Sequence, residues 1–345
     1  SQRSVPLRQR QEVQEVPRSG RFVMSLPSAD EIYTYFERLS NWGRWGDDDA
    51  RGTLNYVTPE VTLAAAQEIR VGRSFSCAWD ETTQRQEGAH FGTPQRSMLN
   101  HGQGLGDADR VVPPHRRTDE RGFGASEFFG LVFHGLNITH IDALSHIFWD
   151  RKMYNGYPAE WVTSQLGATR LAITDIKEGI TTRGVLLDLP RAKGVDWLEP
   201  GTPVTPEDLE QAEAAQELRV RSGDVVFLRT GYGRYRHEHG PGKTTRGQPG
   251  WHASSLPWIH EREVAVIGCD TGQDVTPSGY HAEGLNLPVH SIGISAMGLW
   301  LVDNLDLEAL AATASELERW SFFLSLQPLR IEGGTGSPLN PIALF

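Results

Sequence analysis

Short apolar runs that alternate with helix-like segments set the fold class of this chain. Thr205 stands before Pro206, Glu207 and Asp208, an arrangement typical of a capped helix start. This helix lies between two of four mostly apolar runs bounded by Gly, Pro or Asp, which we interpret as strands: Leu171–Ile173, Val185–Leu189, Val225–Leu228 and Val264–Ile267. Strands that alternate with helices predict an α/β core.

The two ends of the chain add further elements. Ser28 is expected to cap a helix through Leu39, and Thr58 a second helix from Pro59 to about Ile69. A helix from about Leu305 to Trp320 is followed by a last strand, Phe322 to Leu329. Residues 1–27 are polar and lack periodicity, so we expect an arm that is disordered or lies on a neighbouring subunit. Residues 28–345 are expected to form one domain.

Composition narrows the class of partner. The chain has 345 residues, is 38% hydrophobic and 22% charged, and has a net charge of −11, which argues against nucleic acid or an anionic membrane as its partner. A small molecule is the expected partner. Cys77 and Cys269 are too few for a disulfide framework. With no apolar run near the ~18 residues of a membrane span, the expected location is the cytoplasm.

The stretch from residue 133 to 150 carries most of the chemistry. His140 and Asp142 are two residues apart, so on a strand their side chains point to the same face, as ligands of a first-row metal ion would. Such pairs are common, since about 1.5 are expected by chance and two occur. His146 makes the pattern more specific, because a helix after Asp142 would bring it to the same space. A cluster of satisfied core histidines is the competing interpretation.

Other residues are candidates for the walls of a site. Trp42 and Trp45 lie three apart in a Gly- and Asp-rich loop, where they form either a structural lid or an apolar surface for a flat substrate. Asp270 ends the run that begins at Val264, and the carboxyl ends of strands are where α/β folds place their sites. It is a candidate substrate-binding residue or a turn former.

A serine hydrolase and a non-haem iron oxygenase are alternatives to this interpretation. A serine hydrolase of the nucleophile-elbow type is disfavoured, because the chain has no Gly-x-Ser-x-Gly sequence. A non-haem iron oxygenase would use His140, Asp142 and a distal His290. In its 2-oxoglutarate-dependent branch an Arg follows the distal His, whereas residues 291–302 contain none. The iron oxygenase therefore stays a secondary interpretation.

The segment Thr139-His-Ile-Asp-Ala-Leu-Ser-His146 resembles the Thr-His-x-Asp-Ala-Pro-x-His core of the metal-dependent cyclase family, which includes bacterial kynurenine formamidase and isatin hydrolase. Segments outside this core look like a longer-chain branch of the family: Asn41-Trp-Gly-Arg-Trp-Gly, Gly52-Thr-Leu-Asn, His134-Gly, Met153-Tyr-Asn-Gly and the closing Gly333-Gly-Thr-Gly-Ser-Pro-Leu-Asn-Pro. The resemblance covers most of residues 40–345. It implies a single α/β domain of the swivelling β/β/α type that forms a homodimer or homotetramer.

The sequence departs from the full family motif, His-x-Gly-Thr-His-x-Asp-x-Pro-x-His. Leu136 stands in the first His position, with Ile138 for the Gly and Leu144 for the Pro. One metal ligand of the formamidases is therefore missing unless His134, also a candidate substrate-binding residue, replaces it. Downstream, the family has a metal-binding His and, about a dozen residues later, a Glu. The nearest matches here are His290 and Asp303.

The resemblance implies a metal-dependent hydrolase of an amide-like bond, cyclic or N-acyl, in a small molecule, for which an aromatic compound is a candidate. His140, Asp142 and His290 would hold a zinc or manganese ion that activates a water, and His146 would transfer the proton. Two other functions stay open. One is a cyclase or dehydratase that uses the ion as a Lewis acid, and the other is a metal-free binding protein in which Leu136 has abolished catalysis.

Overall fold

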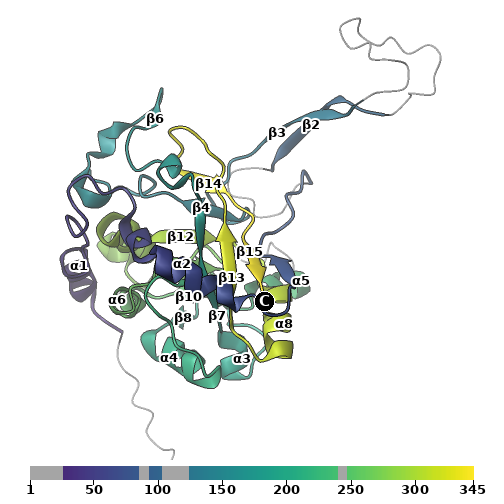
Figure 1. Ribbon diagram of the computed structural model, residues 1–345. Coiled ribbons are helices and arrows are strands. Elements are labelled where there is room, and N and C mark those ends of the chain that lie inside the picture. The colour runs from purple at the N-terminus through teal and green to yellow at the C-terminus, as the bar shows by residue number, and fades with distance from the viewer. Residues whose placement is uncertain (1–25, 85–92, 103–123, 240–246) are drawn as a thin grey trace, which may run out of the picture.

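The computed structural model describes residues 26–84, 93–102, 124–239 and 247–345 (Figure 1). Almost all of the expected N-terminal arm therefore lies outside the described residues. No helix within these ranges is both long enough and apolar enough to cross a membrane.

The described chain is a mixed α/β structure. Its helices are α1 (Ala29–Arg38), α2 (Pro59–Ala65), α3 (Leu189–Lys193), α4 (Pro206–Ala215), α5 (Tyr232–His239), α6 (Leu256–Glu261), α7 (Pro288–Ile292) and α8 (Glu308–Leu317). Its longer strands are β2 (Gln95–Asn100), β3 (Ser126–Gly130), β7 (Ile180–Asp188), β9 (Val225–Arg229), β11 (Val266–Cys269), β12 (Trp300–Asp303) and β13 (Ser321–Leu326). The strands of two or three residues are β1 (Ser74–Ser76), β4 (His140–Asp142), β5 (Val162–Thr163), β6 (Gly167–Ala168), β8 (Pro203–Val204), β10 (Gly250–Trp251), β14 (Gly336–Pro338) and β15 (Ile342–Leu344).

One sheet of nine strands organises the molecule, in the order β1-β15-β13-β7-β9-β11-β12-β4-β14. Strands β7, β9, β11 and β12 run parallel to one another, and the pairs toward both edges are antiparallel. The parallel strands are buried on both faces, as expected for continuous apolar runs covered by helices. The curled sheet with its helices forms the single α/β domain that the resemblance implied.

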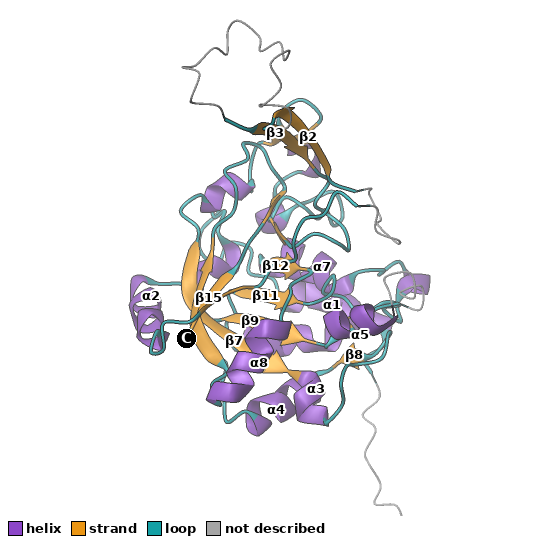
Figure 2. Ribbon diagram, turned by 90° about the vertical axis from the view of Figure 1, so that its right-hand side faces the viewer, coloured by secondary structure: helices purple, strands orange, loops and turns teal. Residues whose placement is uncertain are grey.

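Helices pack on the sheet at several places. Helix α2 contacts β7 and β13, while α3 contacts β9 and α4 contacts β7. Helices α3 and α4 also pack against each other and lie together below the sheet in both views (Figure 2). The hairpin of β2 and β3 instead projects from the rest of the molecule, on the side opposite these two helices.

The predicted helix starts are confirmed. The Ser28 hydroxyl accepts from the backbone amide of Glu31, the Thr58 hydroxyl accepts from that of Val61, and Thr205 forms a capping box with Asp208. Helix α2 is shorter than expected, because residues 66–68 continue it as a 3₁₀ turn. The hydroxyl caps are local signals, which explains why the sequence shows them.

One predicted strand is wrong. Residues 171–173 are not a strand: Leu171 has a φ of 59°, in the left-handed region that strands do not use, and a 3₁₀ helix begins at Ile173. All three side chains are buried. A three-residue apolar run can be buried without pairing, so its hydropathy did not determine its backbone.

Candidate metal centre

The site is built around β4, a three-residue strand between β12 and β14. Its residues His140 and Asp142 are both buried and point to the same face of the sheet. The register brings remote residues beside them, since Asp303 of β12 lies directly opposite His140, and Gly336 of β14 opposite Asp142. Two strands far apart in the chain thus supply the surroundings of the His-x-Asp pair.

Three more imidazoles reach the same space from other segments. His134 precedes β4, and its Nδ1 lies 2.9 Å from Oδ1 of Asp142. The Nε2 of His146 lies 3.9 Å from the same oxygen. His290, on the short helix α7, places its Nε2 3.5 Å from Asp142 Oδ2 and 3.5 Å from Asp303 Oδ2.

The segment after β4 is a turn and not the expected helix. The amide of His146 donates to the carbonyl of Ala143, which turns the chain back at once. The ring of His146 stacks on that of His134, with centroids 3.9 Å apart and planes at 4°. The expectation that His146 reaches the His-x-Asp pair is met through this turn.

The donor atoms are arranged as metal ligands are. The ligand atoms form two groups, and within each group all atoms lie within 4.8 Å of one another. One group comes from His134, His140 and Asp142, and the other from Asp142, His290 and Asp303. Within the described residues, neither buried oxygen of Asp142 nor Oδ1 of Asp303 makes a hydrogen bond of good geometry, although imidazole nitrogens lie 2.9 to 3.9 Å from Asp142. Burying a charged carboxylate costs free energy unless a cation compensates its charge. The residues present therefore fit a divalent ion, with Asp142 common to both groups.

Hydrogen bonds fix which nitrogen of each ring faces the site. His140 donates from Nδ1 to the carbonyl of Ile138 (2.8 Å), so its Nε2, 3.5 Å from Asp142, is the nitrogen left to bind an ion once the ring is neutral. His290 donates from Nδ1 to Asp274 (2.6 Å), with the same result for its Nε2. Such partners orient metal-binding histidines in proteins.

The closing glycine-rich segment positions His134. The Thr335 hydroxyl lies 3.1 Å from Nε2 of His134, which turns Nδ1 toward Asp142. A β-carbon at Gly336 would lie 2.8 Å from the His134 ring and 2.6 Å from the carbonyl of Ile141. Only glycine allows this approach, so the segment is a wall of the site.

Burial and the neighbouring carboxylates shift the pKa values of His140 and His290 in opposite directions, and the carboxylates prevail. Burial alone would lower the pKa of His140, but the carboxylates of Asp142 and Asp303 raise it to about 9. Burial likewise opposes protonation of His290, yet the surrounding carboxylates hold its pKa well above the usual range. Metal binding must therefore displace protons from both rings.

His146 differs from the other rings. Burial lowers the pKa of His146 to about 4, helped by the neighbouring imidazoles and opposed by Asp142. It belongs to neither group of ligand atoms. A neutral, partly accessible imidazole beside the ligand cluster is suited to proton transfer.

Comparison with known proteins decides the family. Residues 76–273 match the Cyclase family model, which is more than half of the chain. The chain belongs to the cyclase family.

Solved structures of cyclase-family proteins agree. The chain is 34% identical to a crystal structure described as a novel cyclase, with a TM-score of 0.79, covering 90% of this chain and 99% of that one. Isatin hydrolase A from Labrenzia aggregata, bound to benzyl benzoate, is 19% identical, with a TM-score of 0.55 and coverage of 84% and 98%. Isatin hydrolase A from Ralstonia solanacearum is 21% identical, with a TM-score of 0.53 and coverage of 83% and 97%. The isatin hydrolases share the fold. A comparison with curated protein sequences gave no match.

The cyclase-family motif position occupied by Leu136 is at the rim of the site. The Leu136 side chain is 37% exposed. A β-carbon at Gly272 would lie 2.9 Å from Leu136 and 3.7 Å from Oδ2 of Asp303, so these three residues adjoin. An apolar group therefore stands beside the ligand cluster, while His134 supplies an imidazole from two residues earlier.

Asp270 binds backbone amides of a neighbouring segment and not the residues of the ligand cluster. Its carboxylate accepts hydrogen bonds from the backbone amides of Thr230, Gly231 and Tyr232 and from the Thr230 hydroxyl. All its acceptor capacity is thus used to hold the segment after β9. This geometry supports the turn-forming role over substrate binding.

The tryptophan loop lies against short helical segments. The indole of Trp42 donates to the carbonyl of Ser295 (2.7 Å) and lies beside Gly156, while Trp45 packs edge-on against Tyr56. Neither indole contacts a residue of the ligand cluster in any interaction identified within the described chain. These contacts favour the structural lid.

Trp42→Ala is therefore expected to lower stability and leave the metal centre intact. The substitution removes a hydrogen bond and ring packing, and we expect a loss of about 1 to 3 kcal/mol in the free energy of unfolding. Thermal unfolding and elemental analysis of the same sample measure the two effects. A higher KM at unchanged melting temperature would instead return Trp42 to the substrate site.

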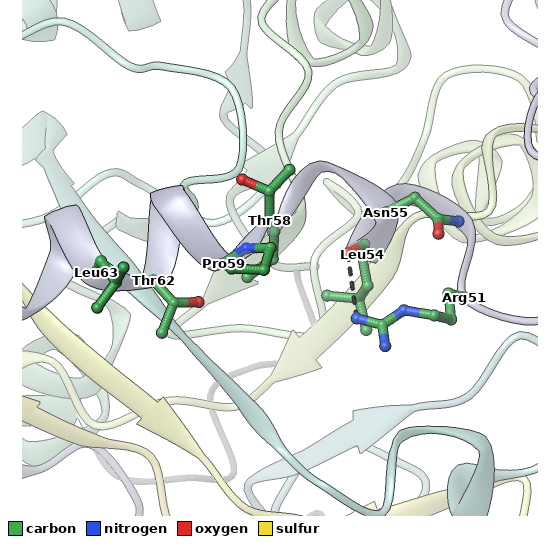
Figure 3. Close-up of a pocket in the computed structure, with 8 residues that line it drawn as sticks. Arg51, Leu54, Asn55, Thr58, Pro59, Thr62 and Leu63 are labelled. Carbon is green, nitrogen blue, oxygen red and sulfur yellow. Dashed lines mark hydrogen bonds between the residues drawn. The ribbon is translucent and has the colours of Figure 1, made fainter.

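A surface hollow lies beside α2, away from the ligand cluster (Figure 3). It is lined by Arg51, Leu54, Asn55, Val57, Thr58, Pro59, Thr62 and Leu63. None of these is a histidine or carboxylate, and the Arg51 guanidinium donates to the carbonyl of Leu54. The hollow has no groups suited to catalysis.

Proposed function

We propose that this cyclase-family protein is a metal-dependent hydrolase of an amide-like bond, cyclic or N-acyl, in a small and flat molecule. The observation that carries the proposal is the convergence of His134, His140 and His290 on the buried carboxylates of Asp142 and Asp303. The isatin hydrolases that share the fold are named as hydrolases, which supports the same reaction class. A cytoplasmic homodimer or homotetramer is part of this proposal.

The ligands in this proposal extend the set expected from sequence. His140, Asp142 and His290 would hold a zinc or manganese ion, and His134 and Asp303 complete the two groups around Asp142. Such an ion lowers the pKa of water and polarises a carbonyl. Because Asp142 belongs to both groups, the ligand set is compatible with one ion or with two.

The protein's own residues supply orientation and proton transfer. His146 lies beside the ligand cluster, is neutral, and can accept a proton at Nε2 and return it to a leaving nitrogen. The stacked rings of His134 and His146, with Phe133 against His134, form an aromatic wall beside the ligand cluster that would suit a planar substrate. Leu136 places an apolar side chain at the rim.

Two measurements test the proposal. Elemental analysis of the purified protein is expected to find zinc or manganese in stoichiometric amount, and added ion is expected to raise the melting temperature. Turnover of a panel of cyclic amides and N-formyl aromatic amines in ¹⁸O-labelled water should place the label in the new carboxylate, which is the ring-opened acid from a cyclic amide and formate from an N-formyl amine. Bound metal without hydrolysis of any member of the panel would favour the cyclase or dehydratase alternative, and a protein without metal or stabilisation by it would indicate the binding protein.

A further inference from the structure

Asp274 is a buried carboxylate that contacts one member of the ligand cluster. It lies in the loop after β11, is 1% exposed, and its Oδ2 is 2.6 Å from Nδ1 of His290. Its two oxygens also accept the backbone amides of Val289 (2.7 Å) and His290 (3.1 Å) in α7. One side chain thus holds both the helix that carries His290 and the ring itself.

These contacts dictate the state of the imidazole. A carboxylate whose oxygens both accept backbone N–H groups presents an acceptor to Nδ1, so Nδ1 must donate. Nε2, which faces Asp142 and Asp303 at 3.5 Å, is then the nitrogen left to bind an ion once the ring is neutral. The backbone bonds keep the carboxylate from rotating away, so the orientation does not depend on solvent.

We propose that Asp274 is a positioning residue that fixes the metal-binding nitrogen of His290. The inference rests on the proposed function, because it gives His290 the role of a ligand. Asp274 touches neither Asp142 nor Asp303 in any interaction identified within the described chain, and it acts through His290 alone.

Asp274→Asn breaks this arrangement with little change of shape. Oδ2 of Asp274 accepts from both Nδ1 and the backbone amide of His290, while Oδ1 accepts from Val289, so the single oxygen of an asparagine cannot serve all three donors. An NH₂ group in the Oδ2 position forces Nδ1 to accept and moves the ring proton to Nε2, whereas one in the Oδ1 position faces the Val289 amide and releases the start of α7. Either orientation weakens the hold on Nε2. Asp274→Glu keeps an acceptor and is the conservative rescue.

Asp188 offers a matched control. It is also buried, also accepts a backbone amide at the start of a five-residue helix (Arg191 in α3), and also pairs with a basic side chain, Arg229, at 2.9 Å. It contacts no residue of the ligand cluster in the described chain. Asp188→Asn should therefore reproduce the structural cost without the effect on metal.

The experiment titrates zinc and manganese separately into the full chain and its variants, with a competing chelator, after each metal-free sample is shown to fold. Asp274→Asn is expected to weaken the metal Kd by about 10- to 100-fold, Asp274→Glu by less, and Asp188→Asn not at all. An unchanged Kd in Asp274→Asn, or equal weakening in Asp188→Asn, would overturn the proposal.

A second readout does not need bound metal. In the metal-free wild type, proton NMR should show a downfield, slowly exchanging N–H resonance from Nδ1 of His290, whether the ring is neutral or charged. If the wild type binds neither ion, the proposed function fails, while this resonance still decides whether Asp274 holds the ring. Its absence from the wild type overturns the inference even where Asp274→Asn does not fold.

Discussion

Replacing Asp142 with alanine is expected to abolish stoichiometric metal binding. Its two oxygens belong to both groups of ligand atoms, and four imidazoles lie within 4 Å of them. Loss of a direct ligand should cost more than the roughly 10- to 100-fold in affinity typical of an orienting partner. His140→Ala should have the same effect, since it removes a ligand from the same strand. Elemental analysis after equilibration with zinc or manganese measures both variants.

The fold is expected to persist in these two variants. Strand β4 is held through its backbone by β12 and β14, and neither side chain donates to nor accepts from the sheet ladder. Circular dichroism and gel filtration provide this control, with Asp188→Asn as a variant that disturbs a buried carboxylate elsewhere. Full metal occupancy in either His140→Ala or Asp142→Ala would exclude the proposed centre.

His146→Ala is expected to retain metal and to lose turnover by about 10²- to 10⁴-fold, the range for a positioned general acid or base. His146 lies outside both ligand groups, and burial lowers its pKa to about 4, so the ring is unprotonated at neutral pH. Steady-state kinetics at saturating substrate, with metal content measured in parallel, separates catalysis from binding.

A half-buried histidine away from the site is the matched control for this variant. His260 on α6 also has a pKa lowered by burial, and His260→Ala should leave kcat unchanged. Loss of metal together with activity in His146→Ala would make His146 a ligand. Unchanged kcat with full metal would remove it from the reaction.

The pairing of His140 with Asp142 could be predicted from sequence because it depends only on the geometry of a strand. The two-residue period of a strand places His140 and Asp142 on one face whatever the rest of the chain does. The same holds for the capped helix starts at Ser28 and Thr58, where a hydroxyl bonds an amide three residues later. The prediction of a strand at residues 171–173 failed because a run of three residues is too short to show a period.

The resemblance offered His290 and Asp303 as candidates, but only the tertiary structure decided that they meet the His-x-Asp pair. Asp303 meets His140 through the register of β12 against β4, and register is set by the pairing of strands remote in sequence. Asp274 reaches His290 because the loop after β11 folds against α7, and no motif in the sequence marks that contact. The sequence determined a histidine and carboxylate pair on an α/β framework. Only long-range packing determined which buried groups surround that pair, because their positions depend on the whole sheet.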